Sequence, residues 1–187
     1  MRKIFLECLV VIVIIFGSCS KSGENIDVSQ QWTVDYNGNL INGPNDSQWS
    51  PKEFSSQELN LFSSLDTANL TGTVKCDSVF TGTSSKNCIF PNPFKTSASF
   101  VFNFSSGFNG LLEFKFVIVD DHLNIIDKGT FKIQATSYPN IPQNPSTSGP
   151  VTLTPNISSG KYRIYITLSS EANPHFYKTW GNIEKTQ

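Results

Sequence analysis

The side chains most able to do chemistry are few in this chain, and their spacing suggests turns. His122 and His175 are the only histidines, and none of the four cysteines is near either of them in sequence. Asp120 and Asp121 stand directly before His122, and adjacent carboxylates occur in some metal and acid–base sites. Neighbours on an extended chain point to opposite sides. We therefore interpret Asp120–Asn124 as a polar hairpin turn, with Ca²⁺ binding as the alternative.

Other motifs of catalysis are absent from the sequence. His175 follows Asn173 and Pro174, which favour turns. The chain lacks a Gly-x-Ser-x-Gly nucleophile motif, a glycine-rich phosphate loop and metal-type spacing of His or Cys. A catalytic triad assembled by the tertiary structure would have only two histidines to draw on. The sequence therefore predicts a protein that is not an enzyme, with no catalytic residues, no metal site and no cofactor.

Cys19 has a clearer chemical assignment because of the residues before it. Arg2 and Lys3 form a basic start, and Cys8–Phe16 is a continuous apolar run. The run is too short for a transmembrane helix, which takes roughly 20 residues, but it fits the apolar region of a secretory signal, about 7–15 residues long. Gly17 and Ser18 then supply the small residues that a signal peptidase needs.

The segment Phe16–Cys19 resembles the lipobox of bacterial lipoproteins, with Phe16 where that family prefers an aliphatic residue. The resemblance implies cleavage before Cys19, lipidation of this cysteine and attachment to a membrane through the lipid. An ordinary secretory signal followed by a chance cysteine is the alternative. We expect residues 1–18 to be the signal peptide, 19–30 the lipidated cysteine and a flexible tether, and 31–187 one domain. The expected location is the cell envelope, as an outer membrane lipoprotein.

Charge and size limit the function further. Removal of the signal takes away two of the 14 basic and one of the 15 acidic side chains, which leaves 12 against 14 and a net charge of −2. A slightly acidic domain is poorly suited to collecting phosphates, so nucleic-acid binding is disfavoured. The remaining chain is long enough to close one hydrophobic core.

Cys76 and Cys88 remain once the signal and the anchor have used the other two cysteines. In an oxidising envelope they can form a disulfide that closes a loop of about 13 residues and stabilises the fold by roughly 3 kcal/mol. Two free buried thiols are the alternative. A metal site would need further ligands, which the sequence does not place near them.

Alternating apolar and polar residues predict one strand after another beyond residue 55. The period-two runs are 98–104, 112–118, 131–133, 151–153 and 162–168. Turn-forming residues separate them at 105–110, 127–129 and 158–160. Convincing helical periodicity is absent. Many short strands separated by turns predict an all-β fold, an antiparallel β-sandwich.

The segment Phe90–Phe94 contains two prolines around Asn92. Because Pro91 and Pro93 fix φ and remove two backbone donors, the segment cannot lie in a central strand, and we expect a bend or a protected edge. Together with the strands and the glycine turn after it, the segment resembles immunoglobulin-like modules of exported bacterial proteins that begin YPNPF and continue strand, strand, D-x-x-G. The similarity covers roughly residues 88–135.

The C-terminal residues Trp180–Gln187 depart from the type IX sorting version of this module, which has a basic terminus. The whole layout also resembles small Bacteroidetes lipoproteins of unknown function. These resemblances imply an immunoglobulin-like sandwich and a lipoprotein location, but no activity.

Several aromatic residues fall outside the alternating runs: Trp32, Tyr36, Trp49, Tyr138, Phe176, Tyr177 and Trp180. Trp32, Trp49 and Trp180 are the candidate binding residues, since exposed aromatic rings stack on sugars and anchor protein interfaces. The alternative is that Trp32 and Trp49 close the ends of the β domain.

Two functions therefore stay open. The first is a non-catalytic envelope module that binds a protein or glycan partner through loops or an edge strand, and a glycan would require a concave aromatic platform. The second is a structural or accessory subunit of a cell-surface assembly, which would require a flat apolar patch or an unpaired sheet edge.

Overall fold

The computed structural model describes residues 25–44, 47–65, 88–104, 110–137, 147–170 and 177–187. Cys19, Cys76 and His175 lie outside these residues, and only the backbone of Cys88 is described. Within them the chain is mostly β, with antiparallel strands and very little helix, which confirms the expected all-β class. None of the helical structure in this described part is long and apolar enough to cross a membrane.

Seven strands form one sheet in the order β3-β4-β7-β6-β5-β8-β9. Their bounds are Cys88–Phe90 for β3, Ala98–Phe104 for β4, Gly110–Val119 for β5, Ile125–Ser137 for β6, Thr147–Leu153 for β7, Gly160–Ser170 for β8 and Tyr177–Lys185 for β9. Each neighbouring pair is antiparallel. A separate hairpin consists of β1 (Thr33–Val34) and β2 (Leu40–Asn42), and α2 spans Ser56–Asn60.

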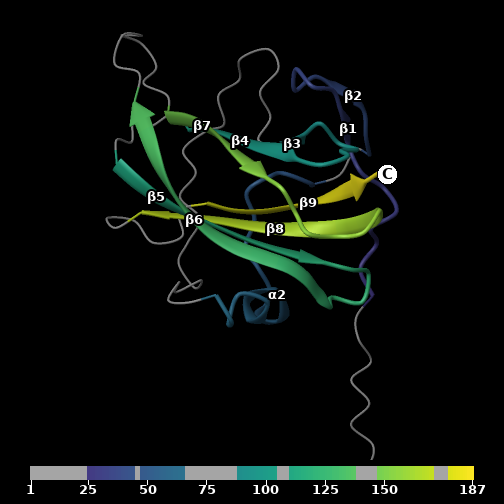
Figure 1. Cartoon of the computed structure of the whole chain (residues 1–187). Coiled ribbons are helices and arrows are strands. Elements are labelled where there is room, and N and C mark those ends of the chain that lie inside the picture. The colour runs from purple at the N-terminus through teal and green to yellow at the C-terminus, as the bar shows by residue number, and fades with distance from the viewer. Residues whose placement is uncertain (1–24, 45–46, 66–87, 105–109, 138–146, 171–176) are drawn as a thin grey trace, which may run out of the picture.

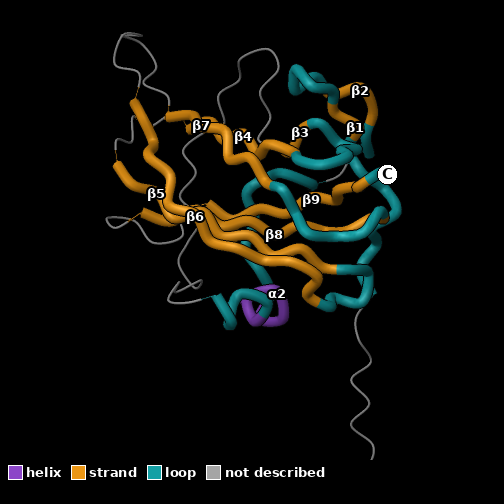
Figure 2. The backbone as a smooth tube through the Cα atoms, in the orientation of Figure 1, coloured by secondary structure: helices purple, strands orange, loops and turns teal. Residues whose placement is uncertain are grey.

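The long strand β6 folds this sheet onto itself. It pairs with β5 over most of its length, and with β7 only through Thr136 and Ser137. In Figure 1 it runs from the lower layer of β5, β8 and β9 up to β7, and Figure 2 shows the same crossing in the backbone trace. As a result β3, β4 and β7 face β5, β8 and β9.

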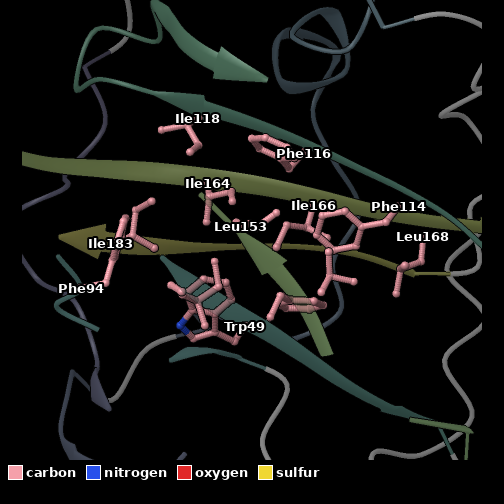
Figure 3. Close-up of a cluster of buried hydrophobic side chains, with 14 of the residues drawn as sticks. Trp49, Phe94, Phe114, Phe116, Ile118, Leu153, Ile164, Ile166, Leu168 and Ile183 are labelled. Atoms are coloured by element: carbon pink, nitrogen blue, oxygen red, sulfur yellow. The ribbon is translucent and has the colours of Figure 1, made fainter. Parts of the chain in front are cut away.

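The main hydrophobic core lies between these two parts of the sheet. Figure 3 shows Phe114, Phe116 and Ile118 of β5 lying with Ile164, Ile166 and Leu168 of β8, and with Leu153 of β7. The core members of β5 and β8 occupy every second position, so one face of each strand points into the core. The alternation in the sequence predicted this arrangement.

The opposite face of β5 and β8 is covered as well. Val117, Val119 and Tyr165 pack against a segment of residues 54–65 whose buried members are Phe54, Leu61 and Phe62. This segment contains α2, which lies below the sheet in Figure 1.

A capping box starts α2. The N–H of Glu58 donates to Ser55 Oγ at 3.3 Å, and the Glu58 carboxylate accepts the N–H of Ser55 at 2.7 Å. The Ser-x-x-Glu spacing is a sequence signal for a helix start that hydrophobic periodicity alone does not reveal.

Two expected features of the strands were wrong. Asp127–Gly129 lies inside β6 and is not a turn: Gly129 sits opposite Phe116, whose ring fills the space of a side chain at that position. Residues 177–185 form the strand β9, although Tyr177 and Trp180 were expected near loops. Both faces of β9 are buried, so its sequence has no period of two.

The expected tether is bound to the sheet over its last residues. The N–H of Ile26 donates to the carbonyl of Asp121 at 2.8 Å. The carbonyl of Asp27 accepts from Arg163 at 2.6 Å and from Asn182 at 3.0 Å. Because buried or charged side chains use these carbonyls, residues 26–30 belong to the folded part.

Asn92 joins three segments, which explains the proline-flanked motif. Its Nδ2 donates to the carbonyls of Trp32 (2.7 Å) and Asn182 (3.1 Å), and its Oδ1 accepts the N–H of Glu184 (2.9 Å). Its backbone exchanges two hydrogen bonds with Val34. Asn92 is fully buried, and the bonds Phe90–Pro91 and Asn92–Pro93 are both cis. The segment therefore has a structural role outside the central strands, as the prolines predicted, and Asn92 holds residues 32–34 and 182–184 together.

Candidate functional site

The edge of β6 is the longest unpaired strand edge in the described sheet. On one side β5 pairs with β6 from Ala135 to Ile125, and on the other side β7 reaches only Thr136 and Ser137. Among the described residues, no backbone group pairs with 128–135 on that second side. An unpaired edge is a template for another strand, so this edge is the main candidate binding site.

A side-chain contact indicates which backbone groups face this edge. The N–H of Lys128 donates to Asp127 Oδ1 at 2.8 Å, and Asp127 Oδ2 accepts the N–H of Asn156 at 3.0 Å from the connection between β7 and β8. We infer that the N–H of Lys128 points away from β5. Alternate residues of an antiparallel ladder direct their backbone groups the same way, so those of Thr130 and Lys132 face the free edge too.

The two faces of β6 differ in chemistry at this edge. Lys128, Thr130 and Lys132 lie on the outer face and are exposed. Phe131 lies on the core face and is 41% exposed, with its ring stacked on Phe116 at a centroid distance of 5.9 Å and an interplanar angle of 9°. The edge is therefore cationic on one face and aromatic on the other.

The outer edge of β9, by contrast, is covered. The N–H of Trp49 donates to the carbonyl of Trp180 at 2.7 Å, and the N–H of Lys52 donates to the carbonyl of Lys178 at 3.0 Å. Further along, the N–H of Phe94 donates to the carbonyl of Glu184 at 3.0 Å. The terminal strand β3 has only three residues. These are common ways of protecting sheet edges, and β6 lacks them over most of its length.

Asp120, Asp121 and His122 form the turn between β5 and β6, as the sequence predicted. Their potential ligand atoms lie within 4.8 Å of one another. Asp120 Oδ1 accepts the N–H groups of His122 (2.9 Å) and Asn124 (2.8 Å), and Oδ2 accepts from Asn124 Nδ2 (2.9 Å). Both oxygens of Asp120 thus hold the turn, which favours the turn interpretation over Ca²⁺ binding.

These contacts change the acidity of the turn. Partial burial acts to raise the pKa of Asp120, but the hydrogen bonds from Asn124 and His122 outweigh it and lower the pKa. The hydrogen bond and the charge of Asp121 raise the pKa of His122, whose ring nitrogen Nδ1 lies 2.6 Å from Asp121 Oδ1. The hydrogen bonds of Asp120 and the contact between Asp121 and His122 therefore stabilise the turn.

The same turn motif occurs in the β1–β2 hairpin. Asp35 Oδ1 accepts the N–H groups of Asn37 and Asn39, both at 2.8 Å, and Oδ2 accepts from Asn39 Nδ2 at 2.9 Å. The bond from the Asn39 side chain, then those from the backbone, lower the pKa of Asp35. Tyr36 and Ile41 are exposed on this hairpin. Figure 1 shows the β1–β2 hairpin on the far side of the molecule from the label of β6.

Trp32 and Trp49 do not form an exposed binding platform. They are only 6% and 3% exposed and belong to the main core. Trp49 fills the space beside Gly181, and Trp32 fills the space beside Gly43. The alternative, in which these two residues close the ends of the domain, fits their burial.

Trp180 lies on the opposite face of β9 and is partly exposed. The guanidinium carbon of Arg163 is 3.9 Å from its ring centroid, and Lys52 Nζ is 5.0 Å from it. Next to it, burial and the charge of Glu58 raise the pKa of Tyr165 to about 12. Since its ring already contacts two cations, Trp180 is part of a packed cluster and not a free stacking surface.

The sequence did not identify the edge residues Lys128, Thr130, Phe131 and Lys132 as a site. The pattern of 131–133 predicted a strand, but the position of a strand in a sheet depends on contacts far along the chain. Two lysines four residues apart on one strand face are a weak signal for an edge.

No protein-family model matches this chain, and no curated protein matches it.

Proposed function

We propose that this protein is a membrane-anchored lipoprotein of the cell envelope that acts as a non-catalytic interaction module and binds a protein partner through the β6 edge. The observation that carries the proposal is the contrast between the covered edge of β9 and the long unpaired edge of β6 among the described residues. Natural sheets shorten or cover most edges, so a long free edge marks a surface available for binding.

We propose an immunoglobulin-like β-sandwich as the scaffold. With β3 to β9 taken as strands A to G, one layer is A-B-E and the other is C-F-G, with β6 beside C and reaching E at its end. This order supports the proposal, since the layers of that fold are A-B-E-D and C-F-G, and only the fourth strand D departs from it by pairing mainly with C. So does Tyr162 near the start of β8, whose hydroxyl donates to the carbonyl of Ser158 at 3.1 Å in the manner of a tyrosine corner.

We place the protein at the outer membrane because of the apolar run and Cys19. The folded part begins near Ile26, about seven residues after the proposed lipid. An extended chain spans at most about 3.5 Å per residue, so the domain would stay within roughly 25 Å of the bilayer.

A protein partner is favoured over a glycan. Sugar binding by stacking needs exposed aromatic rings, and two of the three candidate tryptophans are buried. The accessory-subunit alternative would use the same edge and differ in forming a permanent complex.

Site-specific photo-crosslinking tests the proposal. A photoreactive residue replaces Thr130 at the β6 edge in the full-length protein, expressed in its native envelope. The matched control replaces Thr152, an exposed threonine of β7 that faces β4. We expect a crosslinked partner protein at position 130 and none at 152. No crosslink at 130, or equal crosslinks at both positions, would contradict the proposal.

A further inference from the structure

We propose that the partner segment of the β6 edge is an extended strand in which acidic and apolar residues alternate, and that it extends the sheet next to β6. This inference rests on the proposed function and specifies its partner. Three features of the edge support it: the free backbone groups, the charges of the outer face and the exposed ring on the core face.

The backbone of the edge offers a short ladder for a strand. The N–H of Lys128 is already bonded to Asp127, so the donors available to a partner begin at Thr130 and continue at Lys132. The pairing with β7 at Thr136 closes the other end. A partner strand of about six to eight residues would fill the space between these limits.

The outer face supplies the charge preference. Lys128 and Lys132 are both exposed there and are four residues apart, so they lie on the same side of the strand. Directly opposite residues of an antiparallel pair interact, and opposite charges stabilise such a pair. Glu or Asp at the facing positions of a partner would therefore be attracted. Lys128 Nζ now donates to Ser64 Oγ at 2.5 Å, a bond between exposed groups that water can replace.

A second copy of this chain fits the edge poorly. An antiparallel pairing of two β6 strands centred on Thr130 would place Lys128 of each copy directly opposite Lys132 of the other. Like charges at such positions destabilise the pair. The same lysines that disfavour self-association favour an acidic strand, so charge complementarity selects the partner.

The core face supplies the apolar preference. Phe131 is stacked on Phe116 and also lies 6.2 Å from the ring of Phe114, yet 41% of it remains exposed. Side chains of an added strand alternate between the two faces. Every second residue of the partner would thus lie on the same face of the sheet as Phe131, and an apolar side chain next to this ring would complete its burial. The two faces together specify the alternating acidic and apolar pattern.

Peptide binding to the full-length protein in detergent tests this inference. The probe is the labelled peptide TEVEVEVEVT, and the matched control is TKVKVKVKVT, measured by fluorescence anisotropy. We expect the acidic peptide to bind and the basic peptide to bind at least about tenfold more weakly. Added salt should weaken binding of the acidic peptide, because the charge pairs are solvent-exposed.

Two variants test the backbone ladder and the charge preference separately. Thr130→Pro removes an N–H that faces the free edge and leaves the β5 ladder intact, so we expect it to weaken binding about tenfold or more. The double variant Lys128→Glu/Lys132→Glu should invert the preference toward the basic peptide. Lys95→Glu is the control, because Lys95 is exposed in the turn before β4. If Thr130→Pro fails to fold, the charge-reversal variant decides.

Equal binding of both peptides, no binding of either, or binding that the double variant leaves unchanged would overturn the inference. So would a dimer of the protein alone that Thr130→Pro dissolves. The two experiments fail separately. If crosslinking captures a partner at position 130 but the acidic peptide is not preferred, the proposed function stands and the edge binds a partner of different chemistry.

Discussion

At the scale of single residues, two tryptophan rings occupy the space that a side chain would need at a neighbouring glycine. A Cβ at position 181 would lie 2.0 Å from Trp49 Cε2, and one at position 43 would lie 2.6 Å from Trp32 Cδ1. These glycines are needed for space, because the large rings fill the core where a side chain would otherwise be. The pairing explains how two tryptophans that lie outside the alternating strands become core residues.

Replacement of Gly181 tests this packing. Gly181→Ala should lower the free energy of unfolding by about 2 kcal/mol or more, because the methyl group collides with a buried ring. Gly38→Ala is a useful comparison: its Cβ would meet nothing closer than 3.9 Å, but φ is +80°, so about 1 kcal/mol of backbone strain is expected. Urea unfolding measures both. In a Trp49→Leu background the cost of Gly181→Ala should shrink, and an unchanged cost would argue against the collision.

Asp120 gives the turn between β5 and β6 a dependence on pH. Its pKa in the folded protein lies below its ordinary value of 3.8, so its stabilising effect is fully present above pH 3.8 and is lost as the pH falls through the folded pKa. Asp120→Asn should therefore cost about 1 kcal/mol at pH 7 and much less in strong acid. Unfolding at both pH values measures the difference. A pH-independent cost at position 120 would refute the assignment.

At the scale of elements, the segment with α2 makes the β5–β8 layer buried on both faces. Phe54 and Phe62 stack at 5.9 Å, and Phe54 meets Tyr165 edge-on at 5.5 Å. This second cover leaves Val117, Val119 and Tyr165 buried on a face that the alternating pattern alone would assign to water. The outer face of the sheet is thus a second core.

Truncation of Phe62 tests the contribution of this cover. Phe62→Ala should lower the free energy of unfolding by about 3 kcal/mol, since it removes a ring that is 2% exposed and leaves a cavity. Phe131→Ala serves as the matched comparison, because this ring is 41% exposed and should cost about 1 kcal/mol or less. Chemical unfolding of both variants distinguishes them. Equal costs would mean that the cover adds little.

At the scale of the whole molecule, one long strand decides where the protein is open to binding. Because β6 belongs mainly to the β5 layer and meets β7 only at its end, its edge from 128 to 135 is left unpaired among the described residues. The proposed lipid anchor would hold this edge within a short distance of the membrane.

The anchor itself is testable in the full chain. Cys19→Ser should move the protein out of the membrane fraction, because it removes the thiol that would carry the lipid. Cys8→Ser is the matched control and should leave the protein in the membrane fraction, since that cysteine would depart with the signal. Membrane fractionation and the mass of the N-terminal peptide give the result. Retention of Cys19→Ser in the membrane would contradict lipidation at this residue.

The sequence alone determined the local features of this protein. Alternation located β4, β5 and β8 because alternate residues of each strand enter the main core, and the Asp120–Asn124 turn followed from side chains that bond to their own backbone. The prolines around Asn92 excluded a central strand because they lack donors. Each of these depends on residues close together in the chain.

The tertiary structure decided the rest. β9 could not be found by alternation, because both its faces are buried: Tyr177 and Ile183 lie in the main core, and Trp180 packs against the second cluster on the other face. The burial of Trp49 depends on distant Gly181, and the free backbone edge at Thr130 and Lys132 depends on where β7 stops pairing. Strand order and register arise from contacts between distant residues, so the edge that carries the proposed function could be located only in the folded molecule.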